Sequence, residues 1–486
     1  METQNQAVAL LSPELNKVAS PLRRIHLMGI CGTAMASLAG MLKHEGYTVT
    51  GSDQNVYPPM SDYLASLSIP VLQGYSASNL HARPDLVIVG NVITRSNPEA
   101  VELSRLRIPY LSMPQALQAF AMKGKKSIVI SGTHGKTTTT ALIAWLLERA
   151  GLEPGFMVGG IPANFDGGFR LGKGPYFVVE GDEYDTAFFD KGPKFLHYSP
   201  WVVILTSIEF DHADIYRDLD HVRESFRRLI RLIPSEGRLI ANRDDPVVLA
   251  ESGQAACPVT FYGLEKGGSW SARNISFSTG ETRLEVFRDN GLGMDLTTSL
   301  YGRHNVSNLL SAVALADFLE IETSHLRAAL ETFRGVKRRQ EIKGEKKGIL
   351  VLDDFAHHPT AVKETIRAVR EKYPGRRLIA AFEPRSNSSR RKTFQREYGS
   401  SFDQADRILI PEPPLMDKIA PDERFSSRTL VEDLRKRDLQ ASYFAETRLL
   451  LEEILRTSRE GDVVLFMSNG AFDNLPTRLL AALGEG

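Results

Sequence analysis

The stretch Ser127-Ile128-Val129-Ile130-Ser131-Gly132-Thr133-His134-Gly135-Lys136-Thr137-Thr138 decides the fold of the middle of the chain. An apolar strand runs into a glycine-rich turn, and a helical pattern follows and ends before Gly151. Glycines let the backbone approach phosphate groups, and the start of a helix supplies unpaired N–H groups. Lys136 can reach the terminal phosphates, and the Thr137 hydroxyl can ligate Mg²⁺. The stretch therefore predicts a strand–loop–helix unit that binds nucleotide phosphates.

This loop is shorter than a standard phosphate loop. The full G-x-x-x-x-G-K-[ST] pattern requires glycine at position 130, where the sequence has Ile130. The alternative interpretation is a glycine-rich turn with a solvated lysine. The strand and the helix on either side favour phosphate binding. We therefore expect the loop residues to contact the nucleotide, namely Gly132, Thr133, His134, Gly135, Lys136, Thr137 and Thr138.

Composition describes a large globular protein without a dominant charge. The chain has 486 residues, which at ~150 residues per domain predicts about three domains. Lys+Arg and Asp+Glu both number 59, which argues against a dedicated nucleic-acid binder but not against a local anion site. Two cysteines, Cys31 and Cys257, are too few for a disulfide framework, so we expect a reducing cytoplasm. We find no signal peptide, and no apolar run of the ~18 residues that a membrane span needs.

Strands alternate with helices along the chain, which predicts an α/β protein with parallel sheets. A polar break at residues 123–126 marks one candidate domain boundary, and the short runs between about 255 and 300 predict antiparallel strands. We expect three successive α/β domains after a weakly ordered, flexible extension. The expected segments are residues 1–22 for the extension and residues 23–122, 123–336 and 337–486 for the domains.

Two acidic segments follow predicted strands of the central domain. Glu180 ends an apolar strand, where a carboxylate suits a hard cation that neutralises phosphate charge. The alternative is an acidic surface loop, which fits Asp182, Glu183 or Asp185 taken singly. The second segment, residues 209–214, contains His212. Histidine is a less usual ligand for Mg²⁺, so His212 is either a ligand, a group that supports one, or a structural residue.

The turn after the first strand has the spacing G-x-x-G-x-x-M, beginning at Gly29 and continuing through Cys31 and Gly32. Asp53 follows Gly32 by 21 residues, about where a ribose-binding acid would lie in a dinucleotide site. The spacing is weak evidence for a nicotinamide dinucleotide and better evidence for a diphosphate at a helix N-terminus. A tight turn without a ligand remains an alternative.

The segment Asp353-Asp354-Phe355-Ala356-His357-His358-Pro359-Thr360 ends the first strand of the third domain. Two acids and two imidazoles indicate a metal site, but the proline makes the segment a turn. Hydrogen bonding of one aspartate to a ribose is equally supported. The pair Arg338-Arg339 lies just before this strand. Such a pair is usually solvated, although one arginine beside a nucleotide could neutralise a phosphate in transfer.

Together these motifs resemble the Mur ligase family of ATP-dependent amide-bond ligases. The resemblance extends from about residue 23 to about residue 475 and includes the segments 29–35, 132–138, 180–185, 211–214, 302–308, 338–341 and 353–360. It implies a Rossmann-like N-terminal domain, a central P-loop ATPase-like domain and a C-terminal Rossmann-like domain. It also implies ATP as co-substrate, Mg²⁺ as cofactor and no obligatory protein partner.

Two kinds of member are similar to this sequence. One joins UDP-N-acetylmuramate to L-alanine, and the other joins it to the tripeptide L-alanyl-γ-D-glutamyl-meso-diaminopimelate during murein recycling. Four segments favour the second kind, at residues 55–61, 355–359, 383–387 and 467–472. A nicotinamide-dependent oxidoreductase and a non-catalytic nucleotide-binding scaffold are the rival interpretations. The first leaves the 132–138 loop unexplained, and the second needs no acidic metal ligands.

The resemblance also assigns roles to single residues. Lys136 and Arg339 would neutralise the phosphoryl group in transfer, Thr137 and Glu180 would hold Mg²⁺, and His212 would lie at or near a second ion. Asn305 would hydrogen-bond the adenine, and Asp354 the ribose of ATP. The remaining assignments are UDP-sugar binding by Gly29, Cys31, Gly32, Thr33 and Asp53, and peptide binding by Arg385, Ser386, Asn387, Ser468 and Asn469.

One departure concerns the second metal ion. Some members of the family carry a carbamoylated lysine beyond the Asp-His motif that helps to hold it. No lysine occurs here between residues 195 and 265, and Arg227 and Arg228 stand in the corresponding stretch. We therefore predict no carbamoylated lysine, so a second metal ion would lack that ligand.

Overall fold

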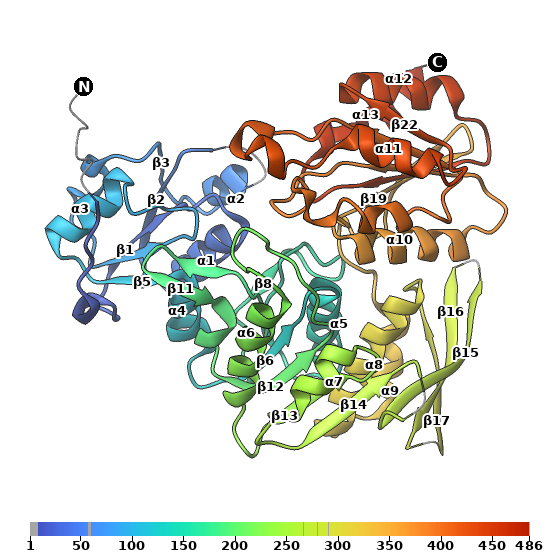
Figure 1. The fold of residues 1–486 in the computed structure, drawn as a ribbon. Helices are drawn as coiled ribbons and strands as arrows, with labels where there is room; N and C mark the ends of the chain where they lie inside the picture. The colour runs from blue at the N-terminus through green and yellow to red at the C-terminus, as the bar shows by residue number, and fades with distance from the viewer. Residues whose placement is uncertain (1–7, 57–59, 266, 279, 290, 486) are drawn as a thin grey trace.

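The computed structural model describes residues 8–56, 60–265, 267–278, 280–289 and 291–485. Three large sheets follow one another along the chain, drawn blue, green to yellow, and orange to red in Figure 1. The predicted three-domain α/β architecture is confirmed. Residues 1–7 of the expected extension, and Tyr57, Pro58 and Pro59 of the segment 55–61, lie outside the described residues.

The first sheet has five parallel strands in the order β3-β2-β1-β4-β5. The chain changes direction across the sheet between β1 and β4, which is where ligands bind in sheets of this kind. The helix α1 (Thr33–His44) begins next to this point, after the turn that follows β1. The other elements are β1 (Arg24–Met28), β2 (Thr48–Asp53), α2 (Met60–Ser66), β3 (Val71–Gln73), β4 (Leu86–Val89), α3 (Pro98–Leu106), β5 (Tyr110–Ser112) and α4 (Met113–Leu117).

The segment before β1 packs against this first sheet over its described part. Ala9 is buried and its backbone N–H donates to the carbonyl of Arg95. The Asn16 side chain donates to the Tyr110 carbonyl at 3.0 Å and also bonds to Gln115. These contacts place residues 9–16 against the domain, while the flexibility expected of the extension stays a prediction.

The central sheet has the order β17-β16-β15-β14-β13-β12-β6-β9-β7-β8. The strands from β14 to β7 pair in parallel, whereas β15, β16 and β17 form an antiparallel meander and β8 pairs antiparallel with β7. The predicted antiparallel region is thus correct for β15–β17 and wrong for β14, which pairs in parallel on both sides. A separate hairpin, β10 (Asp185–Ala187) with β11 (Asp190–Pro193), follows β9.

Helices cover both faces of this sheet. Helices α5, α8 and α9 share one buried apolar cluster with the strands, and α6 packs on the other face. The apolar cluster beneath α6 continues into the first domain, so the first and central domains share one apolar interface. The strands are β6 (Lys126–Ser131), β7 (Gly155–Met157), β8 (Phe169–Arg170), β9 (Tyr176–Gly181), β12 (Pro200–Leu205), β13 (Arg238–Asn242), β14 (Val259–Gly263), β15 (Trp270–Ser278), β16 (Glu281–Arg288) and β17 (Gly291–Thr298). The helices are α5 (Lys136–Arg149), α6 (Leu219–Arg231), α7 (Pro246–Ser252), α8 (Arg303–Phe318) and α9 (Thr323–Thr332).

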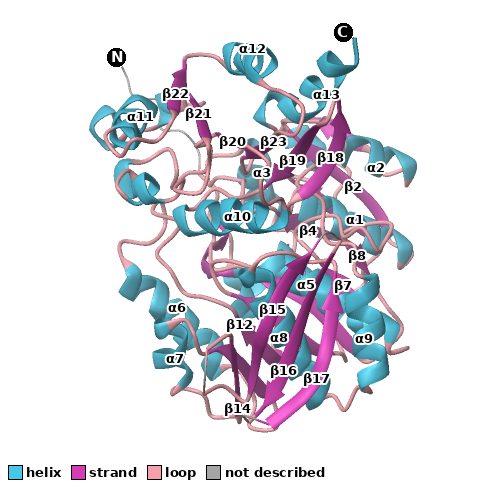
Figure 2. Ribbon diagram, turned by 90° about the vertical axis from the view of Figure 1, so that its right-hand side faces the viewer, coloured by secondary structure: helices cyan, strands magenta, loops and turns pink. Residues whose placement is uncertain are grey.

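The C-terminal sheet has the order β18-β19-β23-β20-β21-β22, with only β18 antiparallel to its neighbour. Helix α10 lies between this sheet and the central domain, against α8 and β15 (Figure 2). Residues that follow β19, β20 and β23 share a cavity with residues of the central domain, so the carboxyl ends of these strands face that domain. The elements are β18 (Glu341–Lys346), β19 (Ile349–Asp354), α10 (Pro359–Lys372), β20 (Leu378–Phe382), β21 (Arg407–Pro411), α11 (Ser427–Arg435), β22 (Ala441–Phe444), α12 (Thr447–Thr457), β23 (Val463–Met467) and α13 (Leu475–Glu485).

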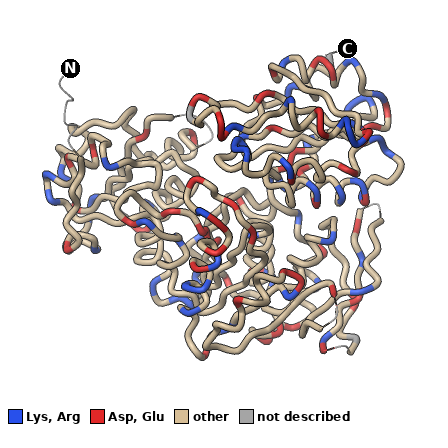
Figure 3. Tube along the Cα trace, viewed as in Figure 1, with Lys and Arg blue, Asp and Glu red and all other residues tan. Residues whose placement is uncertain are grey.

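Charged residues of both signs are spread over all three domains in the described part of the chain (Figure 3). Among the described residues, no helix combines the length and the apolar character needed to cross a membrane.

Candidate active site

A cavity of about 1000 Å³ separates the phosphate loop of the central domain from the C-terminal domain. Its wall combines residues that are far apart in sequence. The predicted residues in its wall are Thr133, His134, Gly135, Lys136, Thr137, Thr138, Glu180, His212, Asn305, Arg339, Asp354, Arg385, Ser386, Asn387 and Asn469. The structure therefore brings together most of the predicted nucleotide, metal and peptide residues around one space. Their roles stay predictions.

The phosphate loop depends on two glycines. Gly132 has φ of +133° and Gly135 has φ of +80°, which side-chain-bearing residues rarely adopt. A Cβ atom on Gly132 would lie 2.2 Å from Thr206 Oγ1, and one on Gly135 would lie 2.5 Å from Asn308 Oδ1. Ile130 belongs instead to the fully buried part of β6. Position 130, where the full pattern requires glycine, therefore lies in the strand and not in the loop, because this loop is shorter than the full pattern.

Lys136 is the first residue of α5 and is held by the loop itself. Its Nζ donates to the Gly132 carbonyl at 2.7 Å and to Glu183 Oε2 at 2.9 Å. Burial alone would lower the pKa of Lys136, but Glu183 and Asp182 keep it above its ordinary value. Glu183 is 3% exposed, so its interpretation as a surface acid is wrong. In sequence it is one of several acids after β9, and nothing there distinguishes it as the partner of Lys136.

Thr137, Glu180 and Arg339 meet beside Lys136. The Thr137 hydroxyl donates to Glu180 Oε2 at 3.2 Å, and Arg339 Nη2 donates to Thr137 Oγ1 at 3.0 Å. Gly159 N–H donates to the other carboxylate oxygen of Glu180 at 2.5 Å. Burial, and then the charge of Asp182, raises the pKa of Glu180 to about 7. A cation bound to these two neighbouring oxygens would relieve that cost, so the donor set fits Mg²⁺.

His212 faces Glu183. Its Nε2 lies 3.4 Å from Glu183 Oε1, and its backbone N–H donates to Asp211 Oδ1 at 2.6 Å. Burial would lower the pKa of His212, but Glu183 and Asp211 keep it raised. His212 therefore belongs to a buried charge cluster with Glu183 and Lys136. The contact with Glu183 supports a role for His212 in orienting the residues around Lys136. The role of His212 as a metal ligand stays a prediction.

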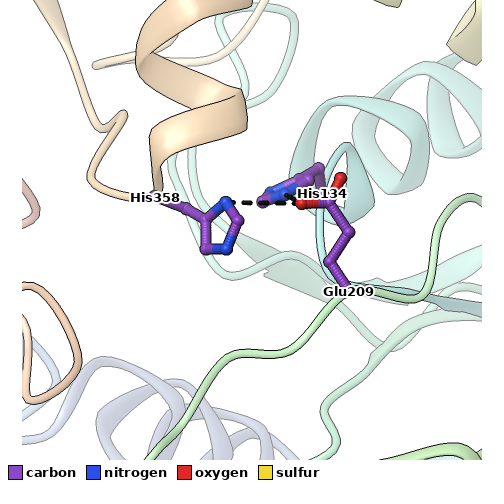
Figure 4. A group of neighbouring side chains, drawn as sticks. All are labelled: His134, Glu209 and His358. Atoms are coloured by element: carbon purple, nitrogen blue, oxygen red, sulfur yellow. Dashed lines mark ion pairs between the residues drawn. The ribbon is translucent and has the colours of Figure 1, made fainter. Parts of the chain in front are cut away.

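His134, Glu209 and His358 join the central and C-terminal domains (Figure 4). Glu209 Oε2 lies 3.5 Å from His134 Nε2 and 3.6 Å from His358 Nδ1, and it accepts a hydrogen bond from Thr360 Oγ1 at 2.7 Å. The two imidazole rings lie 4.7 Å apart. Three potential metal ligands thus converge, but they come from three separate segments rather than from residues 353–360 alone. Glu209 is not among the site residues expected from the sequence.

Burial, followed by the charge of His134, lowers the pKa of His358 to about 4. The unfolded chain should protonate this residue near its ordinary pKa of ~6.5, so stability is present above that pH and is lost as the pH falls toward 4. The substitution His358→Asn keeps a residue that can cap α10. Between pH 7 and pH 5, we expect the wild type to lose about 1–2 kcal/mol more stability than the variant. Urea unfolding at both pH values measures the difference, and equal losses would contradict the assignment.

Asn305 and Asp354 line the cavity but are also bound within the protein. Asn305 Nδ2 donates to the Tyr301 carbonyl at 2.7 Å, and its Oδ1 accepts from Asn308 at 3.2 Å. Asp354, at the end of β19, accepts from the backbone N–H groups of Gln340 at 2.7 Å and Ala356 at 2.8 Å. These bonds fix both side chains at the cavity wall.

The two linker arginines contact different domains. Arg339 reaches Thr137 in the central domain, whereas Arg338 Nη2 donates to the carbonyls of Ser468 and Gly470 at 2.5 Å each. Arg338 is therefore not the solvated residue that a basic pair usually suggests. The sequence offered no signal that would assign the two neighbours to opposite sides of the linker.

Four of the five expected peptide-binding residues line the cavity. Arg385 Nη1 lies 3.5 Å from Glu383 Oε1, which is its only ion pair among the described residues. Asn387 Nδ2 donates to Asp214 Oδ2 at 2.9 Å, and the buried Asn469 Oδ1 has no hydrogen-bond partner within the described part of the chain. Ser468 is absent from the cavity wall. It is buried and donates to Glu383 Oε2 at 2.6 Å, so it supports Glu383 behind Arg385.

The turn after β1 forms a second, smaller site. Asp53 Oδ2 accepts from the Cys31 N–H at 2.9 Å, and Gly29, with φ of +81°, donates to the Ser52 carbonyl. Gly32 and Thr33 line a cavity of about 280 Å³ between the first and central domains. This cavity shares part of its wall with the large one, namely Gly159, Glu180, Asp182 and Tyr184.

In the stretch where some other family members carry the carbamoylated lysine, this chain has an arginine that forms an ion pair. Arg227, on α6, donates through Nε to Glu251 Oε2 of α7 at 2.6 Å. This arginine links two helices and leaves the second metal site without support from that position.

Comparison with known proteins shows the family to which the chain belongs. Three family models match consecutive parts of the chain: "Mur ligase family, catalytic domain" at residues 24–125, "Mur ligase middle domain" at 130–316, and "Mur ligase, glutamate ligase domain" at 338–470. A UDP-N-acetylmuramate–L-alanyl-γ-D-glutamyl-meso-2,6-diaminoheptandioate ligase of Escherichia coli (strain K12) is 39% identical over 95% of this chain and 98% of its own. The chain belongs to the Mur ligase family.

Two further comparisons place this Mur ligase within the family. A UDP-N-acetylmuramate–L-alanine ligase of Desulfotalea psychrophila is 32% identical over 95% of this chain and 98% of its own. The crystal structure of a murein peptide ligase from Psychrobacter arcticus has a TM-score of 0.72 and 34% identity, covering 95% of this chain and 99% of the other. Family membership favours the ATP-dependent ligase over the oxidoreductase and the non-catalytic scaffold.

Proposed function

We propose that this Mur ligase joins UDP-N-acetylmuramate to the tripeptide L-alanyl-γ-D-glutamyl-meso-diaminopimelate, in an ATP-dependent step of murein recycling. The observation that carries the proposal is the 39% identity, across nearly the whole chain, to a ligase named for these two substrates. The relative named for L-alanine is less similar, at 32%. Arg385 supports the same choice, because a guanidinium at the cavity wall can bind a carboxylate remote from the reacting amine.

The reaction proceeds in two chemical steps. A lactyl carboxylate oxygen of the muramic acid attacks the γ-phosphorus of ATP, the bond from that phosphorus to the bridging oxygen breaks, and ADP leaves. The amine of the tripeptide then adds to the carbon of the acyl phosphate. The tetrahedral intermediate collapses to the amide and releases phosphate and a proton. Lys136, bound to the phosphate loop, and Arg339, bound to Thr137, would neutralise the charge that develops on the transferred phosphoryl group.

The metal and nucleoside assignments are parts of the proposal. Thr137 and Glu180 would hold Mg²⁺, which when bound supplies further positive charge next to the phosphates. His212 would orient Glu183 and Lys136 or reach a second ion. Asn305 would contact the adenine and Asp354 the ribose. We further propose that the three domains divide near residues 122 and 336 and that the enzyme works in the cytoplasm, where ATP is available.

The experiment that tests the proposal measures ADP release with ATP, Mg²⁺ and UDP-N-acetylmuramate, comparing the tripeptide with free L-alanine. We expect rapid release with the tripeptide and slow release with L-alanine. The reverse preference would favour the L-alanine-adding ligase, and no release with either acceptor would contradict a ligase of this class.

The position of Gly32 gives a prediction for the first domain. Gly32 precedes α1 with φ of −64°, and a Cβ atom there would lie no closer than 3.6 Å to its nearest neighbour. A side chain therefore fits without disturbing the turn. In the variant Gly32→Glu, a carboxylate would lie at the helix N-terminus and repel a substrate diphosphate. We expect the affinity for UDP-N-acetylmuramate to fall by about 10-fold, the effect of one unfavourable charge contact, while ATP binding persists.

The matched control is Gly32→Gln, which adds a similar volume without the charge. Calorimetric binding of each nucleotide to both variants separates the two effects. A loss of ATP affinity alone in Gly32→Glu would place the two nucleotides the other way round.

A further inference from the structure

Lys194 is a buried cation that none of the assigned roles uses. It begins the short 3₁₀ helix Lys194–His197 after β11, and its side chain is only 8% exposed. Its Nζ donates to Asp182 Oδ2 at 3.3 Å and lies 4.0 Å from the centre of the Tyr184 ring. An ammonium group has three donors, and this is its only hydrogen bond within the described part of the chain. Two donors are thus left for a ligand.

The smaller cavity gives these free donors a place to act. Its wall includes Lys194, the start of α1 and the carboxylates of Glu180 and Asp182. Among its lining residues, Lys194 is the only one with a positively charged side chain. An anion that enters this cavity therefore meets two acids and a single cation.

The junction of the two cavities defines what that anion must be. Glu180, Asp182 and Tyr184 lie in the walls of both cavities, and Lys136 lies in the large one. A substrate whose diphosphate sits at α1 must carry its reacting carboxylate past these acids to reach a phosphate at Lys136. The substrate carboxylate and these acids carry like charges, which repel one another strongly where bulk water is excluded. The path therefore requires a compensating cation.

We propose that Lys194 binds the lactyl carboxylate of UDP-N-acetylmuramate where the two cavities join, and thereby selects the acid over uncharged UDP-sugars. The inference rests on the proposed function, because it names the group that recognises the reacting end of that substrate. An ammonium–carboxylate contact in this poorly solvated position supplies a charge-assisted hydrogen bond.

The alternative role is structural, with Lys194 only neutralising Asp182. Two nucleotide sugars separate the roles. UDP-N-acetylmuramate carries a lactyl ether that ends in a carboxylate, whereas UDP-N-acetylglucosamine has the same uridine, diphosphate and sugar ring with a hydroxyl in place of the lactyl group. A residue that binds the carboxylate affects only the first ligand, and a structural residue affects both.

The experiment measures equilibrium binding of both ligands to the wild type, to Lys194→Met and to the control Lys191→Met. Lys191 lies on β11, three residues before Lys194, is 68% exposed and pairs with Asp185. We expect Lys194→Met to weaken UDP-N-acetylmuramate binding by ~10- to 50-fold and UDP-N-acetylglucosamine binding by less than about 2-fold, as for the loss of one charged hydrogen bond. The control should behave as the wild type. Equal losses for both ligands, or no loss, would overturn the inference.

Two further measurements keep the test decisive. Removing Lys194 leaves Asp182 without its ion pair, so the double variant Lys194→Met/Asp182→Asn, which preserves the local charge balance, should still bind UDP-N-acetylmuramate more weakly than the single variant Asp182→Asn, with UDP-N-acetylglucosamine binding unchanged. The wild type should itself prefer the acid by at least ~10-fold, and equal affinity for the two ligands would overturn the inference without any variant. If the wild type forms the tripeptide product but Lys194→Met binds normally, only the inference fails. If the wild type does not bind UDP-N-acetylmuramate, the proposed function fails with it.

Discussion

The variant Lys136→Ala should lose ligase activity by on the order of 10³-fold, with the loss in kcat. Lys136 Nζ lies at the phosphate loop, 2.7 Å from the Gly132 carbonyl, where the γ-phosphoryl group of ATP would be held. Its charge is needed most as that group leaves ADP, so removing it raises the barrier more than it weakens binding. Steady-state ADP release at saturating substrates measures the effect.

The fold should survive this change because Glu183 retains a second partner. His212 Nε2 lies 3.4 Å from Glu183 Oε1 and can take up the uncompensated charge by protonation. The double variant Lys136→Ala/Glu183→Gln removes the buried acid as well and should be equally inactive but no less stable. Wild-type turnover in Lys136→Ala would contradict the assignment of the phosphate loop.

The second large effect concerns Arg385 and the peptide. In Arg385→Ala we expect kcat/KM for the tripeptide to fall about 10- to 150-fold, which corresponds to a charged hydrogen bond of roughly 1.5–3 kcal/mol. Among the described residues, the guanidinium makes a single ion pair, a 3.5 Å contact with Glu383, so donors remain for a substrate carboxylate. The KM values for ATP and UDP-N-acetylmuramate should barely change.

The matched variant Arg385→Lys keeps the charge but loses the two-pronged geometry, so it should recover only part of the tripeptide activity. Unchanged tripeptide kinetics in Arg385→Ala, or a preference of the wild type for free L-alanine, would contradict the assignment. The L-alanine-adding ligase would then be the better interpretation.

Much of the fold could be predicted because its signals are local. The strands at Arg24–Met28 and Val463–Met467 are short apolar runs, and the helix Lys136–Arg149 follows a glycine turn whose chemistry is written in adjacent residues. The strand β14 could not be assigned correctly from its own pattern. Its parallel pairing is set by its neighbours β13 and β15, which are separated from it by loops.

The candidate site was predictable where a motif carries its own chemistry and not where partners come from distant segments. Glu180 and Lys136 belong to recognisable strand and loop ends. Glu183 resembles a surface acid in sequence, and only the three-dimensional structure places it beside Lys136. Glu209 gains its significance from His134 and His358, which are 75 residues before it and 149 residues after it.

The adjacent arginines of the linker couple the orientation of the C-terminal domain to the position of Arg339 at the phosphate loop. Arg338 is tied to the C-terminal domain and Arg339 to Thr137, so a rotation of one domain against the other must change at least one of these contacts. A ligand that favours one orientation from the C-terminal side also favours the matching position of Arg339 at the loop. Thermodynamic linkage makes this coupling reciprocal, so ATP and the peptide should each raise the affinity for the other by the same factor.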